Sequence, residues 1–501
     1  MRTRRILSVA LFGILVSCTK SGGLGWGTPH ELRIGMVNDP TSLNPLFGYI
    51  QRQIDLGQLY CETLVGLDDH NRLIPLLASP VPSQENGGIS PDGTTITYHL
   101  RRGVRFADGV ELTSKDVAFT YRAVLDPRNP VTDTAAYRSI ASLDTPDRYT
   151  VRIRLRHPWA AAVGDLFAPS DFAVGILPAH AFASTDVSRA AWNDRPFGSG
   201  PFRVVTWARG DEIELVPNPY AWRKPHLRRL VFKIVADNEA LFDAFRAHDI
   251  DVDNLTILQV PQARALRDID IQAVLRNGLD YLSFQTAKPP TDDVRVRRAV
   301  AGAIDRSTLL RSTYVGLRPI ANTEIPSVLW ANDRFIQPPA YDPQRAGRDL
   351  DAAGWRRDGD RRIKNGVPLA IELISDIRDY NRRIDAIVQR DLAQVGIEVT
   401  IRTYTNSIMY APASSGGIQY GGRFNLLSDN LYGGSDPEQS EQWTCATRPP
   451  NGANMARFCD RTYDAAYAAQ QLTLDRAARL RAFAAMQRRI RDEAVLLPLA
   501  R

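Results

Sequence analysis

The side chains that most often carry out catalysis or bind metals are scattered along this sequence of 501 residues. Its seven histidines form no HExxH motif and no closely spaced pair, and no glycine-rich phosphate-binding loop follows a predicted strand. Ser199, in a Gly-Ser-Gly sequence, superficially suggests a nucleophile. Phe197, however, stands where a nucleophile elbow needs glycine, so a tight turn is the better interpretation. The sequence therefore favours a binding protein over an enzyme, and it predicts no cofactor and no metal site.

The four cysteines are typical of an exported protein with one structural disulfide. Cys445 and Cys459 flank a Pro-Pro-Asn-Gly turn, and a disulfide closing that loop contributes roughly 3 kcal/mol in an oxidising compartment. Two free thiols or a metal site are the alternatives, although no histidine lies nearby in the sequence to complete a zinc site. Cys61 follows Leu and Tyr and is expected to be a buried free thiol.

The amino terminus has the pattern of a bacterial export signal. Three arginines precede an apolar run from Ile6 to Val16, which is too short to cross a bilayer core of ~30 Å but long enough for a signal peptide. The run ends in Leu15-Val16-Ser17-Cys18, which looks like a lipobox. We therefore expect a signal peptide over residues 1–17, lipidation of Cys18 and a flexible tether over residues 18–29. A short membrane anchor followed by an incidental cysteine is the alternative.

The composition is that of a folded, water-soluble body. Lys and Arg number 62 against 56 Asp and Glu, and 44% of the residues are hydrophobic, which excludes wholesale disorder. A polytopic membrane protein is also excluded, because only the amino-terminal segment is apolar enough to approach a membrane. The basic residues are scattered rather than clustered, so nucleic-acid binding is not indicated. The length suggests about three domains or one large bilobed body.

Strand and helix patterns mix along the whole chain. Alternating apolar residues predict strands over 31–37, 94–100, 149–155, 201–207, 211–216, 230–235 and 397–401. Helical periodicity predicts helices over 295–310, 381–395 and 473–492, the last with Leu480, Phe483, Met486 and Ile490 facing inward. Gly396 separates the second helix from the strand that follows it, as a helix-ending glycine does. The fold class is therefore α/β or α+β with several lobes.

Several stretches share one resemblance, in the same order and over nearly the whole chain. They are Tyr98–Gly109 with Lys115–Val117, Gly198–Phe202, Asn218–Trp222, Asp292–Val300 with Ile304–Arg306, and Gln394–Val399. Each is a weak signal alone. Together they resemble the extracytoplasmic solute-binding proteins of peptide ABC importers, the family-5 group of dipeptide- and oligopeptide-binding proteins.

The resemblance implies a bilobed periplasmic-binding-protein fold, with two α/β lobes around a cleft plus an extra domain. By analogy, lobe I comprises residues 30–75, 196–284 and 476–501, the extra domain residues 76–195, and lobe III residues 285–475. The sequence stops earlier than the family usually does, so a truncated or unusually short chain is also expected.

The resemblance also implies a function. We expect a monomer, anchored by its lipid to the periplasmic or cell-surface face of a bacterial membrane, that captures short peptides and delivers them to an ABC permease. The family also carries nickel chelates, haem, opines and sugars, so a non-peptide ligand is the alternative. No catalysis is expected.

Two charged residues are given ligand-binding roles by the resemblance. Arg378 lies in an Ile-Arg-Asp-Tyr-Asn sequence similar to the RPYN element of dipeptide-binding proteins, in which the Arg binds the ligand's carboxyl-terminal carboxylate. An arginine paired with Asp376 or Asp379 is the alternative. Asp429 stands before a DPDN-like turn and is the candidate receptor for the α-ammonium, with Asp436 as the alternative.

Tyr380 and Trp443 are further candidate ligand contacts. Cys445 and Cys459 also correspond to two cysteines that flank a similar loop in the dipeptide-binding relatives.

Overall fold

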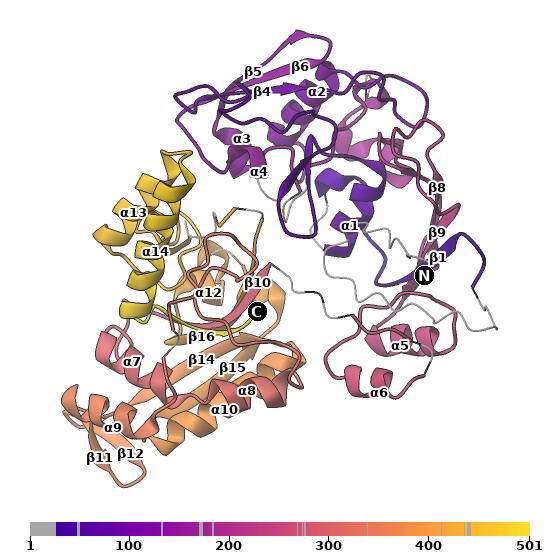
Figure 1. The fold of residues 1–501 in the computed structure, drawn as a ribbon. Coiled ribbons are helices and arrows are strands. Elements are labelled where there is room, and N and C mark those ends of the chain that lie inside the picture. Colours follow the sequence, from indigo (N-terminus) through magenta and orange to yellow (C-terminus); the bar gives the residue numbers. More distant parts are fainter. Residues whose placement is uncertain are drawn as a thin grey trace, which may run out of the picture. The chain divides into compact units, whose positions relative to one another are not determined.

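The computed structural model describes residues 27–47, 51–131, 134–169, 174–182, 185–267, 269–272, 274, 277–337, 339–411, 413–434, 436–437 and 442–501. The expected signal peptide, Cys18 and most of the expected tether therefore lie outside the described residues. The helices that are described include none with the length and apolar character needed to span a membrane. The chain divides into two compact units, Met1–Leu275 and Arg276–Arg501, each of which is coloured by sequence in Figure 1.

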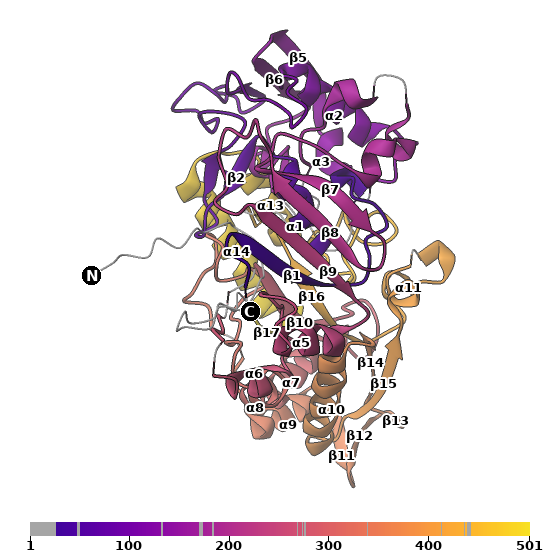
Figure 2. The ribbon, with the colours of Figure 1, turned by 90° about the vertical axis from the view of Figure 1, so that its right-hand side faces the viewer.

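The first unit is built on a four-stranded sheet with the order β1-β9-β8-β7 (Figure 2). β1 (Glu31–Val37) runs parallel to β9 (Arg229–Val235), while β8 (Glu212–Pro217) runs antiparallel to β9 and to β7 (Phe202–Ala208). The amphipathic helix α5 (Asn238–Arg246) buries three apolar residues against β1 and β9: Leu241, Phe242 and Phe245. All four strands agree with the sequence prediction to within one residue.

A second sheet of the same unit has the order β4-β6-β5, with β4 (Thr95–His99), β6 (Thr150–Leu155) and β5 (Ile140–Asp147). Helix α2 (Ser114–Leu125) packs on β5 and β6. The remaining elements of the unit are α1 (Gln51–Tyr60), β2 (Val65–Leu67), β3 (Leu73–Pro75), α3 (Ala135–Arg138), α4 (Ala162–Asp165) and α6 (Val260–Arg264).

Two predictions about single residues hold in this unit. Cys61 is a buried free thiol, and burial raises its pKa. Ser199 is buried in a turn, and a Cβ at Gly198 would lie 2.0 Å from the carbonyl oxygen of Tyr60. The Gly-Ser-Gly sequence therefore serves close backbone packing.

The second unit is built on a five-stranded mixed sheet with the order β15-β14-β16-β10-β17. β14 (Ala370–Asp376) lies parallel to β15 (Glu398–Tyr404) and to β16 (Leu426–Tyr432). β10 (Gly278–Phe284) lies antiparallel to β16 and to β17 (Leu496–Ala500), and every residue of β10 and β17 is buried. Such continuous burial marks these two strands as the centre of the unit's core.

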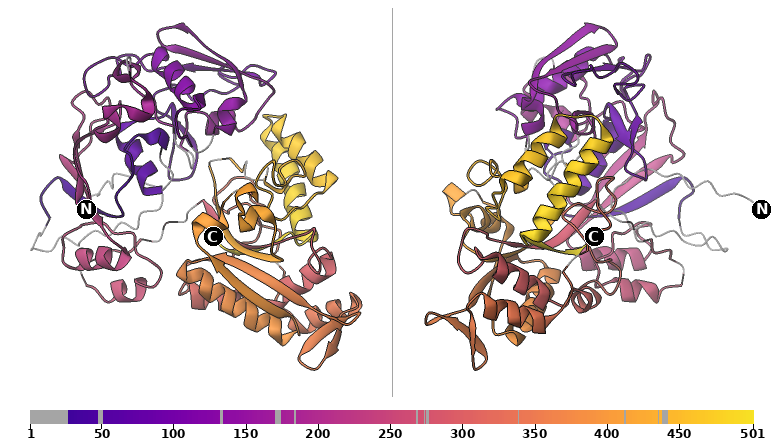
Figure 3. Two further views of the ribbon diagram at one scale, coloured as in Figure 1. Left: turned by 180° about the vertical axis from the view of Figure 1, so that it is seen from behind. Right: turned by 60° about the vertical axis from the view of Figure 1, so that its left-hand side comes forward.

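Helix α10 (Asp379–Gln394) connects the two parallel strands β14 and β15 and packs on them, as Figures 1 and 3 show. Its buried face carries Ile384, Val388 and Leu392. Gly396 follows with a φ of +82°, a conformation that favours glycine, and the chain then enters β15. The predicted order of helix, glycine and strand is confirmed.

Two predicted helices of this unit differ from the structure. The helix expected over 295–310 is two helices, α7 (Val294–Ala303) and α8 (Arg306–Thr313), because the carboxylate of Asp305 caps α8 by accepting from the Thr308 N–H at 3.0 Å. The last helix, α14, spans Arg476–Asp492, and Leu480, which was expected to face inward, is 39% exposed.

The carboxyl-terminal residues also lie elsewhere than the sequence-based division placed them. Residues 476–501 were assigned to lobe I, yet β17 pairs with β10 in the sheet of the second unit. β10 itself, assigned to lobe I within 196–284, lies between β16 and β17 in that sheet. Helix α14 packs antiparallel to α13 (Arg461–Gln471), as Figure 3 shows. Strand pairing between distant segments thus joins these residues to the second unit.

The other elements of the second unit are short or peripheral. They are α9 (Pro343–Ala352), β11 (Arg356–Asp358), β12 (Arg361–Lys364), β13 (Val367–Pro368), α11 (Asn406–Met409) and α12 (Ile418–Gly421).

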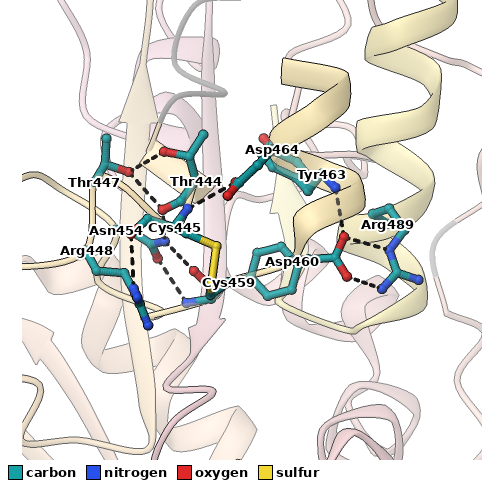
Figure 4. Close-up of a disulfide and its surroundings, with 11 residues drawn as sticks. Thr444, Cys445, Thr447, Arg448, Asn454, Cys459, Asp460, Tyr463, Asp464 and Arg489 are labelled. Carbon is teal, nitrogen blue, oxygen red and sulfur yellow. Dashed lines mark hydrogen bonds and ion pairs between the residues drawn. A yellow bond between two sulfur atoms is a disulfide. The ribbon is translucent and has the colours of Figure 1, made fainter. Parts of the chain in front are cut away.

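A disulfide joins Cys445 to Cys459, as predicted (Figure 4). Within the loop, the Asn454 side-chain amide donates to the carbonyl oxygens of Thr444 and Phe458, both at 2.7 Å. Asp460, which directly follows Cys459, accepts a hydrogen bond from the Tyr463 N–H at 2.8 Å and thereby caps α13.

The same region is tied to the helix pair by charge. Asp460 also forms an ion pair with Arg489 of α14, and the Cys445 N–H donates to Asp464 of α13 at 3.1 Å. The crosslinked loop therefore rests on the helix pair α13–α14.

We predict that replacing Cys445 and Cys459 together by serine lowers the free energy of unfolding by about 3 kcal/mol, because the unfolded chain regains the freedom of the closed loop. Chemical denaturation of the double variant measures this change. Reduced wild-type protein is the matched control and should unfold like the variant; equal stability of oxidised and reduced wild type would contradict the prediction.

Candidate ligand-binding site

Two carboxylates lie side by side where β14 ends. The register pairs Leu373 with Leu426 and Ile374 with Leu427, so Asp376 and Asp429, each two residues further on, face the same side of the sheet. The carboxyl ends of parallel strands are where α/β sheets bind ligands. On the same face, Ile374 and Leu427 share a core cluster with Met409 of α11. This cluster holds α11 against the sheet beside the two carboxylates.

Asp376 has its own cation. The Arg378 Nε donates to Asp376 Oδ1 at 2.8 Å, and Arg378 Nη2 contacts Oδ2. The Asn381 side-chain amide, from the first turn of α10, also donates to Asp376 Oδ1, at 2.7 Å. Burial would raise the pKa of Asp376, but the hydrogen bonds and charge of Arg378 outweigh burial and hold it below its usual value. Asp376 is therefore ionised and fully engaged.

Asp429 has no comparable partner. Its carboxylate is 8% exposed and accepts from Gln419 Nε2 at 2.8 Å and from the Asn430 N–H at 2.8 Å. Arg378 comes only within 3.9 Å, through Nη2. Burial raises the pKa of Asp429 to about 6, although these hydrogen bonds and Arg378 oppose the rise.

One hydroxyl lies between the two carboxylates. Tyr410 Oη is 3.1 Å from Asp376 Oδ2 and 3.1 Å from Asp429 Oδ1. Since a phenol carries a single proton, it satisfies only one of them at a time. Tyr410 is 38% exposed and the Arg378 side chain 32% exposed, so both border the solvent next to Asp429.

A second ion pair lies on the opposite face of the sheet. Asp280 of β10 pairs in register with Asn430 and forms an ion pair with Arg318, and the Tyr314 hydroxyl donates to it. Tyr380 links the two faces: its hydroxyl lies 3.1 Å from the Asn430 amide, and its ring lies 5.1 Å from the Arg378 guanidinium. When the Asn430 amide is oriented with its oxygen toward Arg378, that oxygen also accepts hydrogen bonds from the Arg378 guanidinium.

The other acidic candidate, Asp436, lies in a different setting. Both of its oxygens accept from Arg479 of α14, at 2.6 and 2.8 Å, and both side chains are buried. Arg479 also donates to Gln470 of α13 at 2.9 Å. This bidentate pair fixes the segment after β16 to the helix pair, and it gives Asp436 the dedicated cation that Asp429 lacks.

Trp443 is buried in the core of the second unit. It packs edge-on against Tyr281, with ring centroids 6.0 Å apart, and belongs to the same core cluster. Tyr281 pairs in register with Asp429. The contacts of Trp443 therefore support the strand that carries the carboxylate, and its role as a ligand contact stays a prediction.

The structure places Arg378, Tyr380 and Asp429, three of the residues that the sequence singled out, close together, and their role in ligand binding stays a prediction. The sequence did not indicate the other members of the cluster. Tyr410 and Gln419 lie in a segment without a recognised motif, and strand pairing alone places them. Asp376 was expected only as a partner for Arg378. Asp280 did leave a signal, since a charged residue within an otherwise apolar strand is expensive unless it is paired.

Comparison with known proteins agrees with this fold. Residues 72–451 match the family described as bacterial extracellular solute-binding proteins, family 5 Middle. The chain belongs to this family. A putative ABC transporter peptide-binding protein of Brucella ovis is 31% identical over 420 residues, which cover 80% of this chain and 73% of that protein.

Two solved structures share the fold. NikA from Brucella suis, in complex with Fe(III)-EDTA, has a TM-score of 0.80 and 25% identity, and the match covers 94% of this chain and 93% of that one. The oligopeptide-binding protein AppA from Bacillus subtilis, in complex with a nonapeptide, has a TM-score of 0.74 and 21% identity, and the match covers 94% and 92%.

Membership in this family decides several expectations. The mixed α/β fold is that of the family-5 binding proteins. The protein is an extracellular solute-binding protein of family 5, which is a family of binding proteins and not of enzymes. Among the described residues, no group of three or more His, Cys, Asp or Glu side chains could hold a metal ion.

Proposed function

We propose that the protein is a lipid-anchored receptor that captures peptides by their free amino terminus and delivers them to an ABC permease. The observation that carries the proposal is Asp429, a buried carboxylate without a cation of its own. A peptide importer must recognise what all its ligands share, and the α-ammonium is such a group. An ammonium held by Asp429 forms a charge-assisted hydrogen bond, and neither group is then buried unpaired.

The surroundings of Asp429 suit an ammonium, which has three hydrogen atoms to donate. Gln419 Oε1 is buried without a hydrogen-bond partner among the described residues, and its amide nitrogen already contacts Asp429. The Tyr410 hydroxyl offers a further acceptor, 3.1 Å from the same carboxylate. The carboxylate, amide oxygen and phenol would together receive the three donors.

Asp436 is the weaker candidate, because Arg479 already neutralises it. Of the two arrangements that the sequence left open for Arg378, the pair with Asp376 is present. An anionic metal chelate is disfavoured as ligand, because two carboxylates share one guanidinium at this face.

The test compares Asp429→Asn with Asp436→Asn by calorimetry, using a tripeptide with a free amine and the same tripeptide N-acetylated. Wild type should prefer the free amine by at least tenfold, about 1.4 kcal/mol, and Asp429→Asn should abolish that preference.

The control variant Asp436→Asn should keep the preference in whatever fraction remains folded, as judged by thermal unfolding. If wild type binds both peptides equally, or Asp429→Asn retains the preference, the ammonium is not held by Asp429.

The anchor rests on the sequence before the described residues, where basic residues, a short apolar run and the lipobox-like Leu-Val-Ser-Cys precede the mature chain. We predict that Cys18→Ser moves the protein from the membrane fraction to the soluble fraction, because the soluble body then loses its acyl chains. Cys61→Ala, which alters a buried thiol, is the matched control and should stay with the membrane. Intact mass spectrometry showing no acyl chain on native Cys18 would contradict the anchor.

A further inference from the structure

We infer that the site around Asp429 accepts one ligand cation and excludes a ligand carboxylate, so that this site reads the amino terminus of a peptide but not its carboxyl-terminal charge. This inference rests on the proposed function, because it takes the ligand to be a peptide. It adds the substrate class: short peptides whose carboxyl terminus is blocked or amidated should bind more tightly than their free acids, and a distant carboxylate should make little difference.

The charges at this face do not balance without a ligand. Asp376 and Asp429 lie beside a single guanidinium, that of Arg378, and no other ion pair within 4 Å involves either carboxylate among the described residues. The pair Arg318–Asp280 on the opposite face is balanced in itself. One ligand cation therefore neutralises this cluster of charges, whereas a zwitterion also brings a further anion to it.

Arg378 has no free edge for a ligand carboxylate. Its Nε and Nη2 atoms face the two oxygens of Asp376, which is the bidentate arrangement that a ligand carboxylate would need. Its remaining Nη1 faces the Asn430 amide oxygen. A ligand carboxylate would have to displace Asp376, which is 1% exposed and also held by Asn381.

Arg318 is engaged in the same way. It contacts Asp280 through Nη1, and its Nε donates to the carbonyl oxygen of Arg501 at 3.2 Å. Both arginines near the site thus serve to neutralise strand carboxylates, and neither guanidinium is left free for the ligand's anionic end.

Peptide length separates this inference from a general preference for cations. With at most about 3.6 Å per residue, the carboxylate of a dipeptide stays close to Asp376 and Asp429, while that of a pentapeptide can lie about 15 Å away. Repulsion between like charges should therefore penalise the free acid of a dipeptide more than that of a pentapeptide.

Calorimetry on the wild-type protein tests this with Ala-Ala and a pentaalanine peptide, each as free acid and as carboxyl-terminal amide. We expect the Ala-Ala amide to bind at least fivefold more tightly than the Ala-Ala acid. The affinities of the two pentapeptides should agree within twofold. Any amide that binds at least as tightly as its acid supports the inference; an acid that binds more than threefold more tightly than its amide overturns it.

A variant tests the cause. Asp376→Asn frees the bidentate edge of Arg378, and the preference of Ala-Ala for the amide should fall at least fivefold or reverse. Asp349→Asn makes the same change of charge on the exposed surface of α9 and should leave the preference as in wild type. If near-ultraviolet circular dichroism shows Asp376→Asn to be folded and the preference is unchanged, the inference is overturned.

N-acetylated Ala-Ala amide separates the two proposals. If it binds as well as Ala-Ala amide, the proposed capture of the amino terminus fails. If the N-acetylated Ala-Ala amide does not bind, and the free acids bind more tightly than the amides, only the proposed exclusion of a ligand carboxylate fails.

Discussion

The pairing of β14 with β16 controls the chemistry of the site, because it sets two carboxylates beside one guanidinium. Both strands are parallel and in register at Leu373 and Leu426, and a shift by one residue would turn Asp429 to the opposite face. The chain turns into α10 directly after β14, which brings Arg378 back over Asp376. Arg378 then neutralises the nearer carboxylate, and Asp429 is left with neutral donors only.

An unbalanced buried carboxylate costs the ligand-free protein stability. Folding takes Asp429 out of water, and the hydrogen bonds from Gln419 and the Asn430 N–H only partly compensate. The rise in the pKa of Asp429 to about 6 expresses this cost. The other carboxylates nearby are each paired with a cation, because Asp376, Asp280 and Asp436 all form an ion pair with an arginine. A residue that departs from this pattern is where a functional site is expected.

The elements of the fold were largely predictable because periodicity and turn residues are local signals. The strands β1, β4, β6, β7, β8 and β9 of the first unit follow from them, as do α10, Gly396 and β15, whereas β2, β3 and β5 were not predicted. The break at Ile304 was missed because a single capping aspartate, Asp305, decides it. The position of β17 depends on pairing with β10, two segments far apart in sequence, so no local pattern could place it.

The site was predictable only in part, for the same reason. Short sequence resemblances named Arg378, Tyr380 and Asp429 as candidates, and the structure places them close together. Their partners Tyr410 and Gln419 lie in short helices or at their ends, without a motif, and they reach Asp429 because Met409 packs against Ile374 and Leu427. Long-range packing of this kind shows only in three dimensions.

The central claim is that Asp429 holds the ligand's ammonium, and the protons exchanged on binding test it most directly. Burial raises the pKa of Asp429 to about 6, so binding at pH 6 begins from a partly protonated carboxyl group, while the peptide's α-amine, with an ordinary pKa near 8, is protonated. Binding favours the ionised carboxylate, so calorimetry in two buffers of different ionisation enthalpy should show protons released on binding at pH 6. At pH 8 Asp429 is already ionised and the peptide's amine is partly deprotonated, so binding should take protons up instead. Asp429→Asn should release none at either pH. Binding that neither releases nor takes up protons at pH 6, or that takes them up, would contradict the account.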